Sequence, residues 1–372
     1  MSCAGCRADQ SKFSAENYVC ILKEANFIFA YYMDTKNKII VILGQTSTGK
    51  SDFAVEMAKK ISGLNQSKRL IARTSQSEAL GEIVSADSRQ VYKGMDLGTG
   101  KITKKEMKGI PHYLLDIVSP SKVFTVNDFQ KLANKEISKI HKKNKIPIIC
   151  GGTGFYIDAV VNGTIFPEVP PNEKLRKKLY SKSAIALFEY LEKIDKERAK
   201  TIDKNNKVRL VRAIEIAKAL GKVPSQKLGL GLETFEVLKI GLKIPDEILK
   251  ERIKKRLLSR IKKGMIKEVL SLHEDKKISW KRLESFGLEY KYVSHYLQKI
   301  KNLPNLILEK EKREMIEKLN TEIWHFAKRQ NTWFKRDPNI IWINPLSKSD
   351  KSKTLKEIKK FLSIRQNRGN NT

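Results

Sequence analysis

The chain has 372 residues, enough for a sizeable core, and this length favours two domains or one large domain with an insertion. Its 74 Lys and Arg residues against 41 Asp and Glu give a formal net charge of +33, which indicates a polyanionic partner; a Lys-rich composition bias is the alternative explanation. Four cysteines are too few for a disulfide framework, which argues against the small secreted class.

Residues 1–36 form an N-terminal extension that we expect to be poorly ordered. Cys3 and Cys6 make a single C-x-x-C pair with no second pair at zinc-binding spacing, so an incidental pair is favoured over a metal site. The apolar run 18–33 is too short and too interrupted by polar residues for a membrane span. We therefore expect a cytoplasmic protein with no membrane contact.

The first confident strand, over 39–43, meets a helix over 51–61 through a glycine-rich segment that we call the glycine loop. The loop fits G-x-x-x-x-G-K-[S/T] in the strand–turn–helix context that a phosphate-binding loop requires. Lys50 adds a positive charge and the Ser51 hydroxyl can hold Mg²⁺. The pattern predicts a diphosphate or triphosphate site without specifying a nucleotide. Its residues are Gly44, Gln45, Thr46, Ser47, Thr48, Gly49, Lys50 and Ser51.

The polar, Ser-rich stretch 63–82 reads as an inserted loop, and a short strand over 83–86 follows it and ends at Asp87. Ligands of open α/β sheets bind at the carboxyl ends of the strands, so Asp87 is expected close to the glycine loop. Two roles stay open on spacing alone: a capping or Mg²⁺-positioning carboxylate, and a general base.

Further apolar runs at 113–118, 146–150, 237–244 and 340–343 alternate with helical patterns. This alternation predicts an α/β fold, a parallel sheet flanked by helices of the P-loop NTPase-like kind. The turn Gly151–Gly154 follows the run 146–150, and its Thr153 hydroxyl can contact a phosphate. An ordinary strand-to-helix turn is the alternative.

Residues 163–224 contain no evident strand and read as amphipathic helices, so we predict a small helical subdomain inserted into the sheet domain. The core would then comprise 37–162 and 225–346, with 347–372 as a C-terminal tail. In the helical run 246–272, the apolar residues Leu249, Ile253, Leu257 and Ile261 form one stripe. Arg252, Arg256 and Arg260 repeat on another face, which favours contact with phosphate or RNA.

Aromatic and basic residues interleave in 322–336. This pattern suits single-stranded RNA, whose bases stack on aromatic rings while cations follow the backbone. An amphipathic helix with its aromatics in the core is the alternative. The residues concerned are Trp324, Phe326, Trp333 and Phe334 with Lys328, Arg329, Lys335 and Arg336.

Taken together, these segments resemble one family, the tRNA dimethylallyltransferases, also called tRNA isopentenyltransferases, in their bacterial form. The resemblance runs in order over about 38–345. The similar segments are GQTSTGKS (44–51), SADSRQVYKGMDLGTGK (85–101), PHYLLDIVSP (111–120), FTVNDFQ (124–130), PIICGGTGFYIDAVVNG (147–163), VRLVRAIEI (208–216), RIKKGMIKEV (260–269), FGLEY (286–290) and AKRQNTWFKR (327–336).

The resemblance implies transfer of a dimethylallyl group from dimethylallyl diphosphate to N6 of adenosine 37 in the tRNA anticodon stem-loop, with Mg²⁺ as cofactor and a monomeric enzyme. It implies that the glycine loop binds the donor, that Ser51 serves the metal, and that Asp87, Thr48 and Arg252 are catalytic. Arg252 is favoured over Arg256 as the diphosphate ligand. The residues implied to contact substrate or tRNA are Asp87, Ser88, Arg89, Gln90, Thr153, Arg176, Arg209, Arg212, Arg256, Gly287, Tyr290, Lys328, Arg329 and Gln330.

The chain departs from the family pattern at Gln45, where Pro is usual, and at Ser47; neither change removes a phosphate-binding group. Three rival functions remain to be separated: a small-molecule kinase or other phosphate-loop NTPase, an enzyme that prenylates free adenine nucleotides, and an RNA-binding protein with an inactive nucleotide fold. The basic, aromatic C-terminal third argues against the first two. Intact Lys50, Ser51 and Asp87 argue against the third.

Overall fold

The computed structural model describes residues 37–62, 80–224, 235–301 and 303–363. The predicted extension 1–36 and residues 63–79 of the predicted inserted loop lie outside the described residues. The chain divides into two compact units, which are described separately. One comprises Met1–Ile157 with Glu233–Thr372, and the other comprises Asp158–Leu232.

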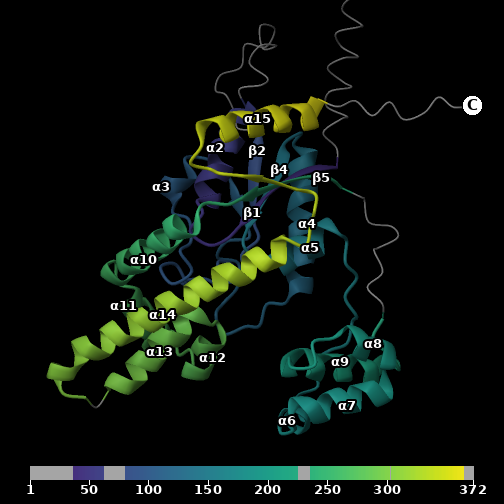
Figure 1. The fold of residues 1–372 in the computed structure, drawn as a ribbon, viewed down its shortest axis with the longest axis vertical. Helices are drawn as coiled ribbons and strands as arrows, with labels where there is room; N and C mark the ends of the chain where they lie inside the picture. The colour runs from purple at the N-terminus through teal and green to yellow at the C-terminus, as the bar shows by residue number, and fades with distance from the viewer. Residues whose placement is uncertain (1–36, 63–79, 225–234, 302, 364–372) are drawn as a thin grey trace, which may run out of the picture. The chain divides into compact units, whose positions relative to one another are not determined.

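The first unit is built on a parallel six-stranded sheet with the strand order β3-β2-β4-β1-β5-β6 (Figure 1). Strands β1, β2 and β4 are buried along their whole length, as expected when helices cover both faces of a parallel sheet. The predicted parallel α/β fold is thus confirmed. The strands are β1 (Lys38–Gly44), β2 (Gly81–Ser85), β3 (His112–Tyr113), β4 (Ile146–Gly151), β5 (Glu236–Leu242) and β6 (Ile340–Ile343).

Strand β2 begins earlier than the sequence indicated. The sequence predicts that Gly81 and Glu82 belong to the inserted loop, but in the structure they pair with Ile146 and Pro147 of β4. The Glu82 side chain is only 1% exposed, and ion pairs with lysines after α4 (Val126–Lys142) stabilise its charge. A buried charge with partners does not show in an apolar pattern, so the strand start was placed too late.

The predicted strand over 113–118 is wrong beyond its first residue. Leu114 and Asp116 have φ angles of 63° and 55°, which no strand residue adopts. The segment instead curls back along the chain, so that the N–H groups of Ile117 and Val118 donate to the Val91 carbonyl. Leu114 is buried, and Ile117 and Val118 are partly buried by packing against a core rather than by pairing in the sheet, which periodicity alone does not distinguish.

Helices cover the sheet and extend beyond one end of it. The predicted tail contains α15, whose Ile358 and Leu362 share a core with Phe53 of α2 on the sheet. Helix α4 begins with a capping box between Thr125 and Asp128. The helices that begin in this unit are α2 (Lys50–Ser62), α3 (Lys104–Met107), α4, α5 (Gly154–Val161), α10 (Asp246–Lys262), α11 (Met265–Glu274), α12 (Trp280–Ser285), α13 (Leu288–Ile300), α14 (Asn305–Phe334) and α15 (Lys348–Ser363).

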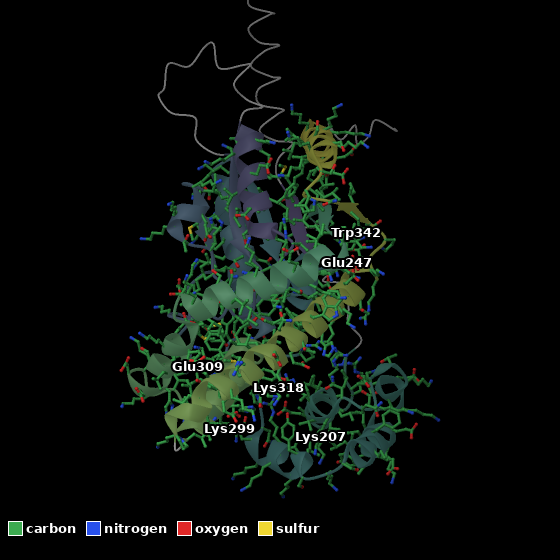
Figure 2. All side chains as sticks on the ribbon, turned by 60° about the vertical axis from the view of Figure 1, so that its left-hand side comes forward. Lys207, Glu247, Lys299, Glu309, Lys318 and Trp342 are labelled. Carbon is green, nitrogen blue, oxygen red and sulfur yellow. The ribbon has the colours of Figure 1, made fainter. Side chains whose placement is uncertain are left out.

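A second core in the same unit joins helices α10 to α14 to residues 91–95. Of the predicted apolar stripe of α10, Leu249, Ile253 and Leu257 are buried in this core, and Ile261 packs against it partly buried. Helices α10 and α14 pack against each other, and Figure 2 shows them side by side, with Glu247 on α10 and Lys318 on α14 labelled. The arginines on another face of α10 line a cavity together with residues at the carboxyl ends of β2 and β4.

The second unit is helical: no strand occurs in its described residues, 158–224. Asparagine, serine or aspartate side chains cap the first turn of each helix. Leu187, Leu191, Leu210 and Ile214 are fully buried in its core. Its helices are α6 (Glu173–Tyr180), α7 (Ala184–Ile194), α8 (Lys196–Thr201) and α9 (Lys207–Leu220).

A buried carboxylate, Glu215 on α9, ties this unit together. It accepts hydrogen bonds from Arg176 at 3.0 and 2.9 Å, from the Asn172 N–H at 2.6 Å and from Arg212. Burial acts to raise the pKa of the Glu215 carboxyl, but these hydrogen bonds and the Arg176 charge outweigh burial and hold the pKa below its ordinary value of 4.5. Glu215 therefore stabilises the unit in its ionised form.

We predict that Glu215→Gln weakens this unit by about 2 kcal/mol at neutral pH, because the two guanidinium groups lose their counter-charge. A lowered pKa gives stability that is present above the ordinary value and is lost as pH falls through the folded-state pKa. The difference from wild type should therefore shrink as pH falls below the ordinary value of 4.5. The measurement is hydrogen exchange of α9 amides, corrected for intrinsic rates. The control is Glu197→Gln, because Glu197 forms an exposed i,i+3 ion pair with Lys200. Equal protection of the α9 amides in Glu215→Gln and wild type at pH 7 would contradict the prediction.

Candidate active site

The glycine loop connects β1 to α2 and owes its shape to its two glycines. A Cβ on Gly44 would lie 2.6 Å from the Leu242 carbonyl oxygen, so only glycine allows β1 to approach β5 this closely. Gly49 has a φ of +91°, and a Cβ there would meet no atom within 4 Å. The second glycine therefore serves the backbone turn, which brings Gly49, Lys50 and Ser51 to the cavity at the start of α2.

Two side chains of the loop fold back on its own backbone. The Thr48 hydroxyl donates to the Gln45 carbonyl at 2.8 Å, and Lys50 Nζ donates to the same oxygen at 2.6 Å. Burial, and to a smaller extent the charge of Arg256, lower the pKa of Lys50 to about 8, although nearby Asp87 acts in the opposite direction. An anion beside Lys50 would raise that pKa, so the site favours a negatively charged ligand.

Asp87 follows β2, as predicted, and lines the same cavity as the glycine loop. Its Oδ1 accepts the backbone N–H groups of Arg89 at 2.8 Å and Gln90 at 3.3 Å. Within the described part of the chain, Oδ2 accepts no hydrogen bond from the protein. Oδ1 therefore orients the carboxylate while Oδ2 is available for a ligand.

The Gly151–Gly154 turn is more than a simple connection from β4 to α5. A Cβ on Gly151 would lie 2.2 Å from the Ala86 carbonyl oxygen, so the turn lies directly against the end of β2. The Thr153 hydroxyl accepts the Ser88 N–H at 3.1 Å. Because β2, β4 and β1 are neighbours in the sheet, Asp87, this turn and the glycine loop meet at one edge.

Gln330 of α14 joins the glycine loop to that turn. Its Oε1 accepts the Thr46 N–H at 2.7 Å, and its Nε2 donates to the Gly152 carbonyl at 2.9 Å. A Cβ on Gly152 would lie 2.3 Å from Gln330 Nε2, so the second glycine makes room for the amide. Lys328 and Arg329, one turn or less away, are exposed. Helix α14 thus turns Gln330 to the site and its basic residues to the surface.

Arginines of α10 form the opposite wall of the cavity, which has a volume of about 650 Å³. Both Arg252 and Arg256 line it. Arg256 donates to the Gly100 carbonyl at 3.2 Å and reaches the Thr46 hydroxyl at 3.5 Å. Burial and the neighbouring Arg260 lower the pKa of Arg256 to about 10, so it remains protonated at neutral pH. This geometry favours Arg256 over Arg252 as the arginine nearest the glycine loop.

Other residues predicted for the site are not among those that line this cavity. Arg176, Arg209 and Arg212 belong to the second unit, where Arg176 and Arg212 pair with Glu215 and Arg209 is exposed. Gly287 has a φ of 76° at the start of α13. Tyr290 is 2% exposed, and its hydroxyl donates to Glu268 at 2.8 Å.

Sequence reasoning missed a carboxylate that shapes the cavity wall. Glu268 of α11 accepts the N–H groups of Asp96, Leu97 and Gly98 at 2.7 to 3.0 Å. It thereby holds the segment 96–101, which we call the 96–101 loop, against the helices. The only sequence signal for this close packing is the pair Gly98 and Gly100. A Cβ on Gly98 would lie 2.6 Å from the Tyr290 ring, so glycine is what lets the loop approach α13.

The donor set suits magnesium bound through a phosphate ligand. Among the described residues there is no group of three or more His, Cys, Asp or Glu side chains that could hold a metal ion. Ser51 and Asp87 line one cavity and offer a hydroxyl and a carboxylate. Mg²⁺ commonly takes one or two protein oxygens and completes its octahedron with phosphate oxygens and water. The residues present therefore fit Mg²⁺ carried with a diphosphate.

Comparison with known proteins identifies similar chains. The family model described as IPP transferase matches residues 90–337. The tRNA dimethylallyltransferase 2 of Treponema denticola is 42% identical over 84% of this chain and 96% of its own length. The tRNA dimethylallyltransferase of Halothermothrix orenii is 38% identical, over 87% of this chain and 92% of its own.

Solved structures agree with these sequence matches. The full-length tRNA isopentenylpyrophosphate transferase of Bacillus halodurans superposes with a TM-score of 0.61 at 31% identity, covering 88% of this chain and 97% of its own. A eukaryotic dimethylallyltransferase described as acting on tRNA superposes with a TM-score of 0.67 at 25% identity, over 87% and 78% of the two chains. In the part of the chain that the structure describes, no helix combines the length and apolar character that a bilayer crossing requires.

We predict that Gln330→Met, which keeps the side-chain length, weakens the affinity for inorganic diphosphate by about tenfold. The physical reason is that the Thr46 N–H and the Gly152 carbonyl lose their shared partner, so the glycine loop is no longer held beside the turn. Calorimetric titration with diphosphate and Mg²⁺ measures the effect. Gln298→Met on the exposed side of α13 is the matched control. Unchanged affinity in Gln330→Met would show that the bridge does not shape the site.

Proposed function

The chain belongs to the IPP transferase family, and we propose that it transfers the dimethylallyl group of dimethylallyl diphosphate to N6 of adenosine 37 in tRNA. One observation carries the proposal: the glycine loop, Asp87 and Arg256 line a single cavity. A cradle for a leaving diphosphate and a carboxylate able to take a proton thus share one site.

The cations of the cavity would stabilise the leaving group. As the bond between C1 of the dimethylallyl group and the diphosphate oxygen breaks, its electron pair passes to that oxygen and negative charge grows there. Lys50, Arg256 and the N–H groups at the start of α2 are positioned to bind this charge. Charges already held in place need no rearrangement when the transition state forms, which lowers the barrier.

Asp87 would act on the acceptor. The N6 nitrogen of adenine bonds to C1 as the diphosphate departs, and the nitrogen must then lose a proton. With Oδ1 held by the N–H groups of Arg89 and Gln90, Oδ2 is the oxygen we assign to receive that proton. The proposal therefore chooses the general-base role for Asp87.

Mg²⁺ is the cofactor we propose. It would be held by Ser51 and the diphosphate oxygens, with Asp87 close by, and would supply further positive charge to the leaving group. We propose a structural rather than a catalytic role for Thr48, because its hydroxyl donates a hydrogen bond to the Gln45 carbonyl within the glycine loop.

The polyanionic partner we propose is the anticodon stem-loop of tRNA. The net charge of +33 supports a phosphate-backbone contact. Near the site, Phe155 is 43% exposed beside Trp333, and Arg336 lies 5.3 Å from the Trp333 ring centroid. Such a surface suits unstacked bases, and adenosine 37 must leave its stack to reach a buried carbon. We further propose that the enzyme works as a monomer in the cytoplasm.

We predict that the purified protein, given radiolabelled dimethylallyl diphosphate, Mg²⁺ and unmodified tRNA, transfers label to the tRNA and not to AMP. Asp87→Asn should lower transfer at least about 100-fold while donor affinity changes by less than about threefold, since an amide keeps the Oδ1 contacts but is no base. The control is Asp203→Asn, because Asp203 is exposed and, like Asp87, accepts the backbone N–H of the residue two positions later.

Two results would overturn the proposal. Label on AMP alone would assign the chain to free-nucleotide prenylation, and ATP turnover without label transfer would assign it to the phosphate-loop NTPases. Wild-type transfer rates in Asp87→Asn would leave the reaction standing but remove Asp87 as the base.

A further inference from the structure

Two arginines of α10 converge on the same short stretch of the 96–101 loop. Arg256 donates to the Gly100 carbonyl at 3.2 Å, and Arg260, one helical turn later, donates to the Gly98 carbonyl at 3.3 Å. A Cβ on Gly100 would lie 1.6 Å from an Nη atom of Arg260 and 2.3 Å from one of Arg256. The two guanidinium groups therefore meet over Gly100.

Glu289 of α13 is the counter-ion of this pair. Its carboxylate accepts Arg260 Nη1 at 2.9 Å, and the two side chains are only 13% and 11% exposed. Arg260 lowers the pKa of Arg256, whereas Glu289 acts to raise it. Burial raises the pKa of the Glu289 carboxyl, and the Arg260 charge opposes this.

Glu289 itself does not line the cavity, although Arg252, Arg256 and Arg260 do. Its effect on a ligand must therefore pass through Arg260. Held by Glu289 and the Gly98 carbonyl, Arg260 is kept from the Gly100 carbonyl. Arg256 occupies that carbonyl and lies within reach of the Thr46 hydroxyl of the glycine loop.

We propose that Glu289 is a positioning residue for the transfer reaction: by pairing with Arg260, it keeps the second guanidinium from displacing Arg256, and so fixes the cation that binds the donor diphosphate. The inference rests on the proposed function, in which Arg256 contacts that diphosphate. It adds a residue from another helix, outside the cavity, to the machinery that holds the leaving group.

The first test is Glu289→Gln, which keeps the shape of the side chain and removes its charge. The Kd of dimethylallyl diphosphate with Mg²⁺, measured by calorimetry on the full chain, should rise about tenfold, and KM for the donor should rise equally. The kcat should fall as well, because Arg256 also binds the charge that grows on the leaving group, whereas the affinity for tRNA should stay within about threefold of wild type. Glu284→Gln, a partly exposed glutamate on the neighbouring α12, is the matched control and should bind the donor as wild type does.

The second test is a double-mutant cycle with Arg260→Gln. Alone, Arg260→Gln leaves Glu289 as a buried carboxylate that draws Arg256 away, so donor affinity should fall about tenfold. The double variant has neither an unpaired Glu289 carboxylate nor an unpaired Arg260 guanidinium. Its donor affinity should therefore return to within about threefold of wild type. A merely structural contact would give no such recovery, because both variants would lose packing.

Three outcomes overturn the inference: wild-type donor affinity in Glu289→Gln, a loss confined to kcat, or a double variant whose loss is the product of the two single losses. Because calorimetry reports donor binding without turnover, the first and third outcomes are read independently of transfer. A wild-type protein that binds the donor but labels no tRNA would instead contradict the proposed function.

Discussion

The side-chain amide of Gln330 is the interaction on which the arrangement of the site depends. It binds the Thr46 N–H and the Gly152 carbonyl at once, and one turn earlier the Ala327 carbonyl accepts Gln45 Nε2 at 3.1 Å. Helix α14 is thereby fixed to the ends of β1 and β4. Since α14 also packs on α10, the same contacts set where the arginines of α10 stand relative to the glycine loop.

Fixed charges supplied from the helical part of the unit complete the cavity. Glu268 holds the N–H groups of the 96–101 loop, while Arg256 and Arg260 hold its carbonyls. The N–H groups and the carbonyl groups of the 96–101 loop are thus both hydrogen-bonded, and these bonds orient Arg256 and Arg260. A leaving diphosphate requires such preset charges, because groups that had to reorganise during the reaction would lose much of their effect.

Much of the sheet and of the glycine loop could be predicted because their signals are local. A buried strand, a G-x-x-x-x-G-K-S spacing and a helix lie within about 25 residues, and the Asp87 position follows from the rule of strand ends. The roles of Gln330 and Glu268 could not, because they depend on contacts across 284 and 172 positions. The strand predicted over 113–118 was wrong for another reason. An apolar run indicates burial, but it does not reveal that Leu114 and Asp116 have positive φ angles.

The central claim is that the glycine loop holds the leaving group of a prenyl transfer rather than a nucleotide whose γ-phosphate reacts. Its most direct test is the stoichiometry of a reaction without ATP, with released diphosphate quantified against prenylated adenosine 37 found by mass spectrometry of the digested tRNA. We predict that one diphosphate is released per modified adenosine and that the reaction releases no inorganic phosphate. Modification that requires ATP, or phosphate release in place of diphosphate, would contradict it.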